Sequence, residues 1–201
     1  MILESLVDLV DIGIKSLNKS FEEIRMCELG DQRMKWNKYR TGKRYFLEFK
    51  KVIEHVSIDI NGKNGALPLN MNESRTEWRN YFDIISDFGT SEHVTNQYMM
   101  FYNTHNFCKI GGVMAHVNPI VGGWKGHSPY RYHQDFYFEL AKINGYEVIL
   151  SELRLVEGRF NNMKDIDRTI VCAVLKKKQD NFASKEEFLK ISSKIDGFKN
   201  D

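Results

Sequence analysis

Short apolar segments alternate with helix-like segments along most of this chain. Strand-like apolar runs occupy 24–29, 52–59, 66–71, 81–90, 112–118, 146–155 and 168–177. Helix-like patterns occupy 1–20, 45–51, 95–107 and 134–144. This alternation predicts an α/β fold with a mostly parallel sheet and helices on both faces. Only a polar loop joins the final two runs, so we expect the last strand to lie antiparallel to the others.

The chain carries no sign of a second domain. It has 201 residues, 42% of them hydrophobic, which is enough for one domain with a substantial core. We find no internal repeat, no low-complexity tract and no linker. We therefore expect a single domain over 1–201, made of an N-terminal helix at 1–20, a core at 21–178 and a charged tail at 179–201. The tail is expected to carry one more exposed helix.

The charge and the cysteine content of the chain limit the cellular compartment and the binding partners that we expect. The formal net charge is only +2, so nucleic acid is not expected as a partner, and the basic run between 35 and 44 is interpreted as a solvated face. No apolar run is long enough to span a bilayer, and Glu4, Asp8 and Asp11 interrupt the only candidate signal segment. The three scattered cysteines are typical of free thiols in a reducing compartment. We expect a cytoplasmic protein that does not bind membranes.

Polar residues follow four of the predicted strands. Ligands of open parallel sheets bind beyond the carboxyl ends of the strands. Gly30 would let the backbone approach a ligand closely, and Asp59 is placed like an acid that accepts both hydroxyls of a ribose. Asn70 offers an amide for the edge of an adenine ring. Each residue alone also has a structural explanation, since Asp59 before Asn61-Gly62 is ordinary turn chemistry. The order of the four strand ends favours a cofactor site.

The sequence resembles the class I S-adenosylmethionine-dependent methyltransferases over about residues 21–176. The resemblance lies in the order of elements and in the motifs "CELGDQ", "SIDINGKNGALPLN", "FDIISDFGTSEHV", "KIGGVMAHVNP" and "FYFELAKINGYEV". It implies a Rossmann-like three-layer sandwich with a mostly parallel seven-stranded sheet and a reversed last strand. It also implies S-adenosylmethionine as the cofactor.

The resemblance also implies a role for each motif. Glu28, Gly30 and the following loop, with Asp31 and Gln32, would approach the amino-acid part of the cofactor. Asp59 would hold the ribose, with Asn61 beside it, and Asn70 would lie near the adenine. The turn formed by Asp87, Phe88, Gly89 and Thr90 would lie beside the methionine moiety.

Two positions depart from the family pattern. The first loop normally reads acid-X-glycine-X-glycine-X-glycine, and only Gly30 is present here. Asp31 and Gln32 would either bind the charged end of the cofactor or narrow its site. At the third strand Asn70 stands where aspartate is frequent, although an amide oxygen can still accept from an amino group.

Histidines supply the candidates for acid–base chemistry. Methyl transfer to oxygen or nitrogen often needs a base, and the pKa of histidine lies near neutrality. His93 follows the fourth strand directly and is the first candidate, with Glu92 as orienting partner or alternative base; His127 and His133 come next. Metal binding by some of the histidines is the competing interpretation. Because their spacing matches no short metal motif, we expect no metal site.

The predicted function is methyl transfer from S-adenosylmethionine to oxygen or nitrogen of a small molecule. Aromatic residues with Lys125 and Arg131 in the loop 119–133 would form an acceptor pocket suited to a sugar or a nucleotide-linked metabolite. The glycine-poor loop favours an alternative, a non-catalytic binding or scaffold domain. A metal-dependent enzyme on the same sheet is a further alternative. Whether a second copy of the chain completes the site is left open.

Overall fold

The computed structural model describes residues 4–34, 38–157 and 162–198. The strands are β1 (Arg25–Leu29), β2 (Arg33–Met34), β3 (Arg40–Thr41), β4 (Glu54–Ile58), β5 (Phe82–Phe88), β6 (Cys108–Pro119), β7 (Arg131–Tyr132), β8 (Glu147–Leu155), β9 (Thr169–Lys176) and β10 (Ile195–Asp196). The α-helices are α1 (Val7–Leu17), α2 (Gly42–Arg44), α3 (Gln97–Phe107), α4 (Phe136–Asn144), α5 (Asp165–Arg168) and α6 (Lys185–Ile191). Single helical turns lie at η1 (Glu4–Leu6), η2 (Phe21–Glu23), η3 (Tyr45–Phe49), η4 (Lys63–Gly65), η5 (Ser91–His93) and η6 (Ser192–Lys194).

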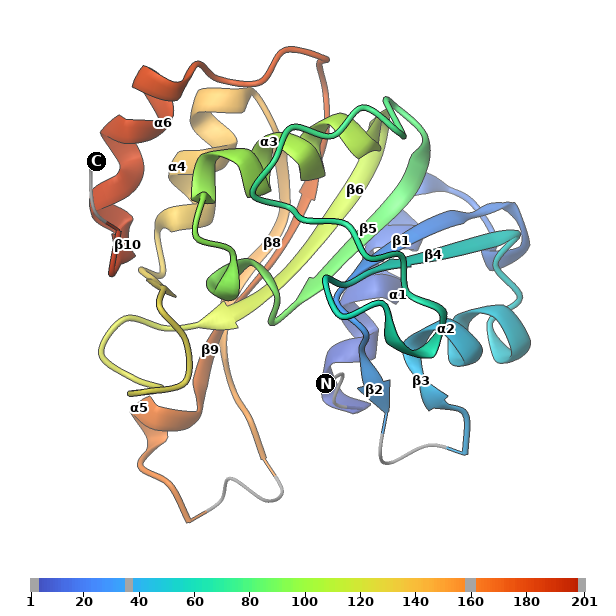
Figure 1. Cartoon of the computed structure of the whole chain (residues 1–201), viewed down its shortest axis with the longest axis horizontal. Coiled ribbons are helices and arrows are strands. Elements are labelled where there is room, and N and C mark those ends of the chain that lie inside the picture. The colour runs from blue at the N-terminus through green and yellow to red at the C-terminus, as the bar shows by residue number, and fades with distance from the viewer. Residues whose placement is uncertain (1–3, 35–37, 158–161, 199–201) are drawn as a thin grey trace.

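A six-stranded sheet forms the centre of the molecule (Figure 1). Its strand order is β4-β1-β5-β6-β9-β8. The four strands β4, β1, β5 and β6 are parallel. The strand β9 lies antiparallel to both of its neighbours, β6 and β8. The prediction of an α/β fold with a mostly parallel sheet is confirmed, and the carboxyl ends of β1, β4 and β5 meet at one edge.

The sheet has six strands and not the seven that were predicted, because the segment 66–71 does not form a strand. It pairs with β4 through the isolated bridge between Ile58 and Leu67 alone. The backbone N–H of Leu69 then donates to the carbonyl of Leu67 at 2.9 Å, so the chain turns at Pro68 and makes no further ladder bond. The segment instead continues past the carboxyl end of β4 toward the site.

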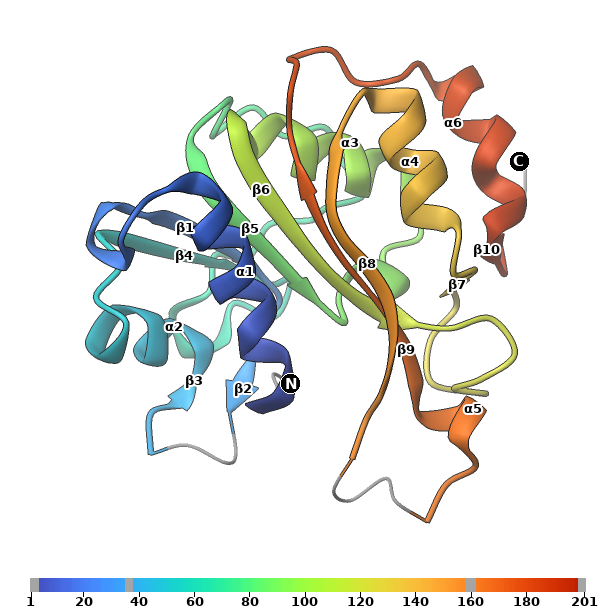
Figure 2. The same ribbon diagram turned by 180° about the vertical axis from the view of Figure 1, so that it is seen from behind.

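Helices cover both faces of the sheet, which gives three layers (Figures 1 and 2). On one face α3 and α4 bury Phe101 and Phe136 against the sheet, and α6 packs on α4 with its buried Phe188 in the same apolar cluster. On the opposite face α1 packs Leu9 and Val10 onto it, and the α2–η3 segment joins the same apolar cluster. All seven residues of β5 are buried, as expected for a strand covered on both sides.

The C-terminal tail carries the predicted helix, α6, which packs one face onto the molecule and leaves Lys185, Glu186 and Lys190 exposed. Phe188 and Ile191 of α6 are buried, and β10 pairs antiparallel with β7 through Ile195 and Tyr132. The capping box of Ser184 and Glu187 begins α6, since each residue satisfies the backbone of the other. The last three residues of the tail, the first three of the N-terminal helix and positions 35–37 of the basic run lie outside the described residues.

None of the helices in the described ranges combines the length and the apolar character that a membrane crossing requires.

Candidate functional site

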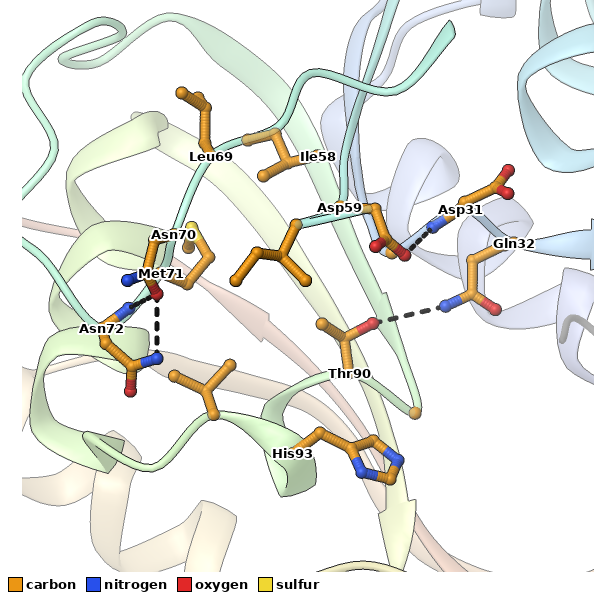
Figure 3. A pocket seen from close by; sticks show the side chains of 14 residues that line it. Asp31, Gln32, Ile58, Asp59, Leu69, Asn70, Met71, Asn72, Thr90 and His93 are labelled. Carbon is orange, nitrogen blue, oxygen red and sulfur yellow. Dashed lines mark hydrogen bonds between the residues drawn. The ribbon is translucent and has the colours of Figure 1, made fainter. Parts of the chain in front are cut away.

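A cavity of about 390 Å³ lies at the carboxyl ends of β1, β4 and β5. Four segments line it, contributed by the turns after these strands and by the chain around Asn70 (Figure 3). The lining residues are Gly30, Asp31, Gln32, Ile58, Asp59, Ile60, Leu69, Asn70, Met71, Asn72, Gly89, Thr90, His93 and Val94. The volume falls within the roughly 300–1,000 Å³ typical of small-molecule sites.

Gly30 lets the chain turn sharply at the end of β1. Its φ angle is +91°, which L side chains rarely adopt, and its N–H donates to the carbonyl of Ile58 at 2.6 Å. A Cβ at this position would meet Oγ1 of Thr90 at 2.5 Å and Nε2 of Gln32 at 2.6 Å. A glycine therefore suits this position, where the buried backbone forms part of the cavity wall.

Asp59 follows β4 and faces the turn after β1 (Figure 3). Its Oδ2 accepts from the backbone N–H of Asp31 at 2.8 Å, and its Oδ1 accepts from that of Asn61 at 2.9 Å. A carboxylate has about four acceptor sites, so lone pairs remain on both oxygens toward the cavity. The side chain of Asn61 accepts from the N–H of Lys63 at 2.7 Å, and Asn61 does not line the cavity.

Gln32 fills the space between the ends of β1 and β5. Its side-chain N–H₂ donates to the carbonyl of Leu29 at 3.1 Å and to Oγ1 of Thr90 at 3.3 Å. The amide oxygen is buried without a partner. Asp31 also lines the cavity, and its carboxylate accepts from Nδ2 of Asn64 at 2.5 Å. The amide of Gln32 therefore narrows the side of the cavity where the family pattern has glycines.

Asn70 lies at the opposite side of the cavity with its amide already bonded locally. The oxygen accepts from the backbone N–H and the side chain of Asn72, at 3.1 and 2.9 Å, and its N–H₂ donates to Glu73 at 3.0 Å. The wall around it is apolar, formed by Leu69, Met71 and Val94. Sequence reasoning did not find these apolar lining residues, whose only signal was that each neighbours a polar strand-end residue.

Glu28 lies behind the turn after β1 and does not line the cavity. It is fully buried, and Oγ of Ser57 donates to its Oε2 at 3.1 Å while Oε1 has no partner. Burial, which disfavours the charged form, raises the pKa of this carboxyl group to about 8. Glu28 is therefore mainly neutral near pH 7.

Asp87 shapes the turn after β5 from below. One carboxylate oxygen accepts from the N–H groups of Thr90 and Ser91, at 3.2 and 3.0 Å, and the other accepts from Nδ1 of His116 at 3.0 Å. Asp87 is buried and does not line the cavity, whereas Gly89 and Thr90 do. Phe88 belongs to the apolar core beneath α1.

Glu92, His93 and His127 come together beside the cavity. Oε1 of Glu92 lies 3.8 Å from Nε2 of His93 and 3.7 Å from Nε2 of His127, and the two imidazole centroids are 5.4 Å apart. Glu92 is buried, and its Oε2 accepts from Nδ2 of Asn118 at 2.9 Å. The hydroxyl of Tyr137 donates to the oxygen of Asn118. Asn118, on β6, was not predicted as a site residue, and Tyr137, on α4, was expected only among the aromatic residues of the acceptor pocket.

His133, the fourth predicted catalytic residue, lies apart from this cluster at the start of α4. Its Nδ1 is 3.2 Å from the carboxylate of Asp135. His105 is buried between the hydroxyl of Tyr146 and the carbonyl of Asp180, and burial lowers its pKa to about 4. His55 stacks on Phe46. The contacts of these three histidines are therefore with neighbouring residues of the fold and not with the cavity.

A second hollow, of about 460 Å³, lies on the other side of His127. Trp124, Lys125, Gly126, His127, Met163 and Asp167 line it. Trp124 has a φ angle of +52°, an uncommon conformation for a bulky residue, and its indole N–H donates to the carbonyl of Thr169 at 2.6 Å. Arg131, predicted to share this rim with Lys125, instead pairs with Asp196 at 2.7 Å.

No protein-family model and no curated protein sequence matches this chain. Solved structures do. One is 1,6-didemethyltoxoflavin-N1-methyltransferase of Burkholderia thailandensis with bound 1,6-didemethyltoxoflavin and S-adenosylhomocysteine, at a TM-score of 0.58 and 12% identity, over 88% of this chain and 79% of that one. Another is the N-methyltransferase NodS of Bradyrhizobium japonicum with S-adenosylhomocysteine, at 0.57 and 12%, over 88% and 87%. At these identities the likeness concerns the fold: the chain has the Rossmann-like α/β fold of S-adenosylmethionine-dependent methyltransferases.

Proposed function

We propose that this protein binds S-adenosylmethionine and transfers its methyl group to oxygen or nitrogen of a small molecule. The observation that carries the proposal is the cavity at the carboxyl ends of β1, β4 and β5, where the turn at Gly30 and Asp31 meets the carboxylate of Asp59. When bound, S-adenosylmethionine supplies an electrophilic methyl group on a sulfonium centre. The chain must bind it, orient the acceptor and accept a proton.

The cavity offers a matching surface for each part of the cofactor. The free lone pairs of Asp59 suit the two hydroxyls of a ribose. Ile60, Leu69 and Met71 provide an apolar wall for the adenine, with Asn70 at its edge. Gly30, which lines the cavity without a side chain, is proposed to lie against the amino-acid end, with Gln32 and Thr90 also in the lining. We propose Glu28, Asn61, Asp87 and Phe88 as supports of these turns, because none of the four lines the cavity.

The second hollow is the proposed acceptor site. His127 borders it, His93 borders the cofactor cavity, and their rings are in contact, so the two spaces meet at this pair. Nε2 of His93 is the proposed proton acceptor, with Glu92 beside it. Lys125 favours an acidic acceptor, such as a phosphorylated sugar or nucleotide. The two similar structures named above are N-methyltransferases, one of them with bound 1,6-didemethyltoxoflavin, which supports a small-molecule acceptor.

The first experiment is a calorimetric titration with S-adenosylhomocysteine. Asp59→Ala removes the acceptor for the ribose hydroxyls, and hydrogen bonds to a charged group contribute roughly 1.5–3 kcal/mol each. We expect binding at least about tenfold weaker in Asp59→Ala than in the wild type. The matched control is Asp8→Ala, an exposed aspartate of α1 that pairs with Arg154 at 2.7 Å. This variant should bind like the wild type, and thermal melting should show that both variants are folded.

A non-catalytic binding domain is the second candidate, and the position of Gln32 favours it. Its amide occupies the gap in which the family pattern has glycines. Absence of S-adenosylhomocysteine binding in the folded wild type would contradict the cofactor proposal. The scaffold function would then be preferred.

A further inference from the structure

We infer that Glu92, His93 and His127 form a binding site for a divalent transition-metal ion of the zinc type. One carboxylate oxygen and one nitrogen of each imidazole lie within 4.8 Å of one another. In the described ranges of the chain, no other group of histidine, cysteine and acidic side chains converges in this way. The inference rests on this geometry and does not depend on methyl transfer.

The spacing of the three atoms suits an ion better than a direct contact. Oε1 of Glu92 is 3.8 and 3.7 Å from the two nitrogens, beyond the 2.7–3.2 Å or so of a hydrogen bond. Zinc bonds to nitrogen and to carboxylate oxygen are about 2.0–2.2 Å long, which puts two ligands of a tetrahedral ion about 3.4 Å apart. Oε1 would therefore need to approach each nitrogen by only a few tenths of an ångström, and the two nitrogens, which lie within 4.8 Å of each other, would need to approach by up to about 1.4 Å. Both imidazoles are about half exposed and can make these movements.

The donor set and its support also match a metal centre. Two histidines and one carboxylate are a recurrent ligand set for zinc and for non-haem iron. Metal-binding carboxylates are commonly held by an outer hydrogen bond. Here Asn118 donates to Oε2 of the buried Glu92, which leaves Oε1 directed at the imidazoles. Tyr137 in turn fixes the amide of Asn118, so the least mobile ligand is held before an ion binds.

The other histidines lack such surroundings. His133 has a single carboxylate, that of Asp135, at 3.2 Å. Nδ1 of His116 is bonded to Asp87, and both ring nitrogens of His105 are bonded. The three cysteines are buried in the core, away from solvent. A divalent ion added to the folded protein is therefore expected at the Glu92 cluster.

The position of the cluster would allow a bound ion to contact the acceptor in the proposed methyltransferase reaction. His93 borders the cofactor cavity and His127 borders the second hollow, so three protein ligands leave a coordination position for an oxygen or nitrogen of the acceptor. A bound ion lowers the pKa of such a group. With the ion present Nε2 of His93 is a ligand, so the base role assigned to it applies only to the metal-free protein. This step alone rests on the proposed function.

The test is titration of chelator-treated full-length protein with Zn²⁺ by calorimetry, with Co²⁺ absorption as a report on ligand type. We expect one equivalent of Zn²⁺ to bind the wild type. Loss of a residue that only supports a metal ligand costs roughly 10- to 100-fold in metal affinity. Loss of a ligand itself should cost at least as much, so we expect the Zn²⁺ affinity of His93→Ala and of His127→Ala to fall about 100-fold. The matched control is His133→Ala, because its side chain is about as exposed and also lies beside a carboxylate.

Three results would overturn the inference. The folded wild type could fail to bind Zn²⁺; His93→Ala and His127→Ala could bind like the wild type; or His133→Ala could lose as much affinity as they do. Thermal melting establishes folding, and both imidazoles are exposed enough for alanine to be tolerated. Titration of the same metal-free samples with S-adenosylhomocysteine separately tests the cofactor proposal. Zinc binding without cofactor binding would support the metal site and contradict the methyltransferase function.

Discussion

Glu28 is a carboxyl group held where its neutral form is favoured. It lies on β1 between Ser57 of β4 and Ser86 of β5, and it is fully buried with one oxygen unpartnered. Burial raises its pKa from 4.5 to about 8. An ionised group here would add negative charge next to Asp31 and Asp59, which already meet at the same strand ends. In the proposed function, a neutral Glu28 leaves Asp59 as the main carboxylate acceptor at these strand ends.

The raised pKa makes a contribution to stability that depends on pH. Below about pH 4.5 Glu28 is protonated in both the folded and the unfolded chain. Between pH 4.5 and 8 the folded state keeps the proton that the unfolded state has released, so stability falls as pH rises. Relative to Glu28→Gln, the wild type should lose on the order of a few kcal/mol of unfolding free energy between pH 5 and pH 8. Urea unfolding at several pH values measures the difference.

An exposed glutamate provides the control for this series. Glu186→Gln changes the same chemical group in the first turn of α6, where the side chain faces solvent. Its stability difference from the wild type should vary much less with pH. A pH-independent difference for Glu28→Gln would mean that Glu28 is ionised in the folded protein.

At the scale of elements, the turn after β5 depends on a residue that never reaches the cavity. Asp87 accepts from the N–H groups of Thr90 and Ser91 and from His116. Asp87→Ala leaves these buried donors unsatisfied, at about 1–3 kcal/mol each. We expect a loss of about 3 kcal/mol of stability or more, together with weaker S-adenosylhomocysteine binding because Gly89 and Thr90 are released. Chemical unfolding and calorimetry measure the two effects.

Asp83, on the same strand, separates a loss of stability from a loss of the site. It is also buried, and it accepts from Lys19, Lys109 and the backbone of Arg25 at the opposite end of β5. Asp83→Ala should lower stability while cofactor binding in the folded protein stays near the wild-type value. Equal loss of binding in both variants would contradict a specific role for Asp87 in shaping the turn.

The same elements show which features the sequence could predict. Buried strands and amphipathic helices leave periodic apolar patterns, so β1, β5, β9 and α4 were predicted close to their observed bounds, whereas β6 begins four residues before the predicted start at 112. The segment 66–71 has an apolar pattern too, yet it forms one bridge and then turns, because Leu69 bonds back to Leu67 across Pro68. That choice depends on a local hydrogen bond that no periodicity records.

The candidate site likewise contains residues whose meeting the sequence could predict and residues whose meeting it could not. Gly30, Asp59 and Thr90 follow buried strands, and the rule for parallel sheets brings strand ends together, so their meeting could be expected. His127 lies in the loop after β6, whose path over the surface carries no repeating pattern. Its approach to Glu92 and His93 is therefore visible only in three dimensions, and spacing along the chain argued against a metal site.

At the scale of the whole molecule, parallel strands joined by crossovers gather segments that are remote in sequence at one edge. The cavity draws on the turn at 30–32, the stretch at 58–72 and the turn at 89–94. The strands β8 and β9, at the opposite edge of the sheet, contribute nothing to it. A ligand bound in the cavity should therefore stabilise these three segments directly and leave β8 and β9 without a direct contact.

Hydrogen exchange with and without S-adenosylhomocysteine tests this arrangement. At about 100 times its dissociation constant, a ligand that binds only the folded state adds about 2.7 kcal/mol to stability. That gain should raise the melting temperature by roughly 5–10 °C for a chain of this size. Local protection should increase at 30–32, 58–72 and 89–94 together, because one ligand contacts all three segments. Locally opening amides of β8 should change little, and Asp59→Ala at the same ligand concentration should lose the added protection. Protection confined to one segment would mean that the three strand ends do not form a single site.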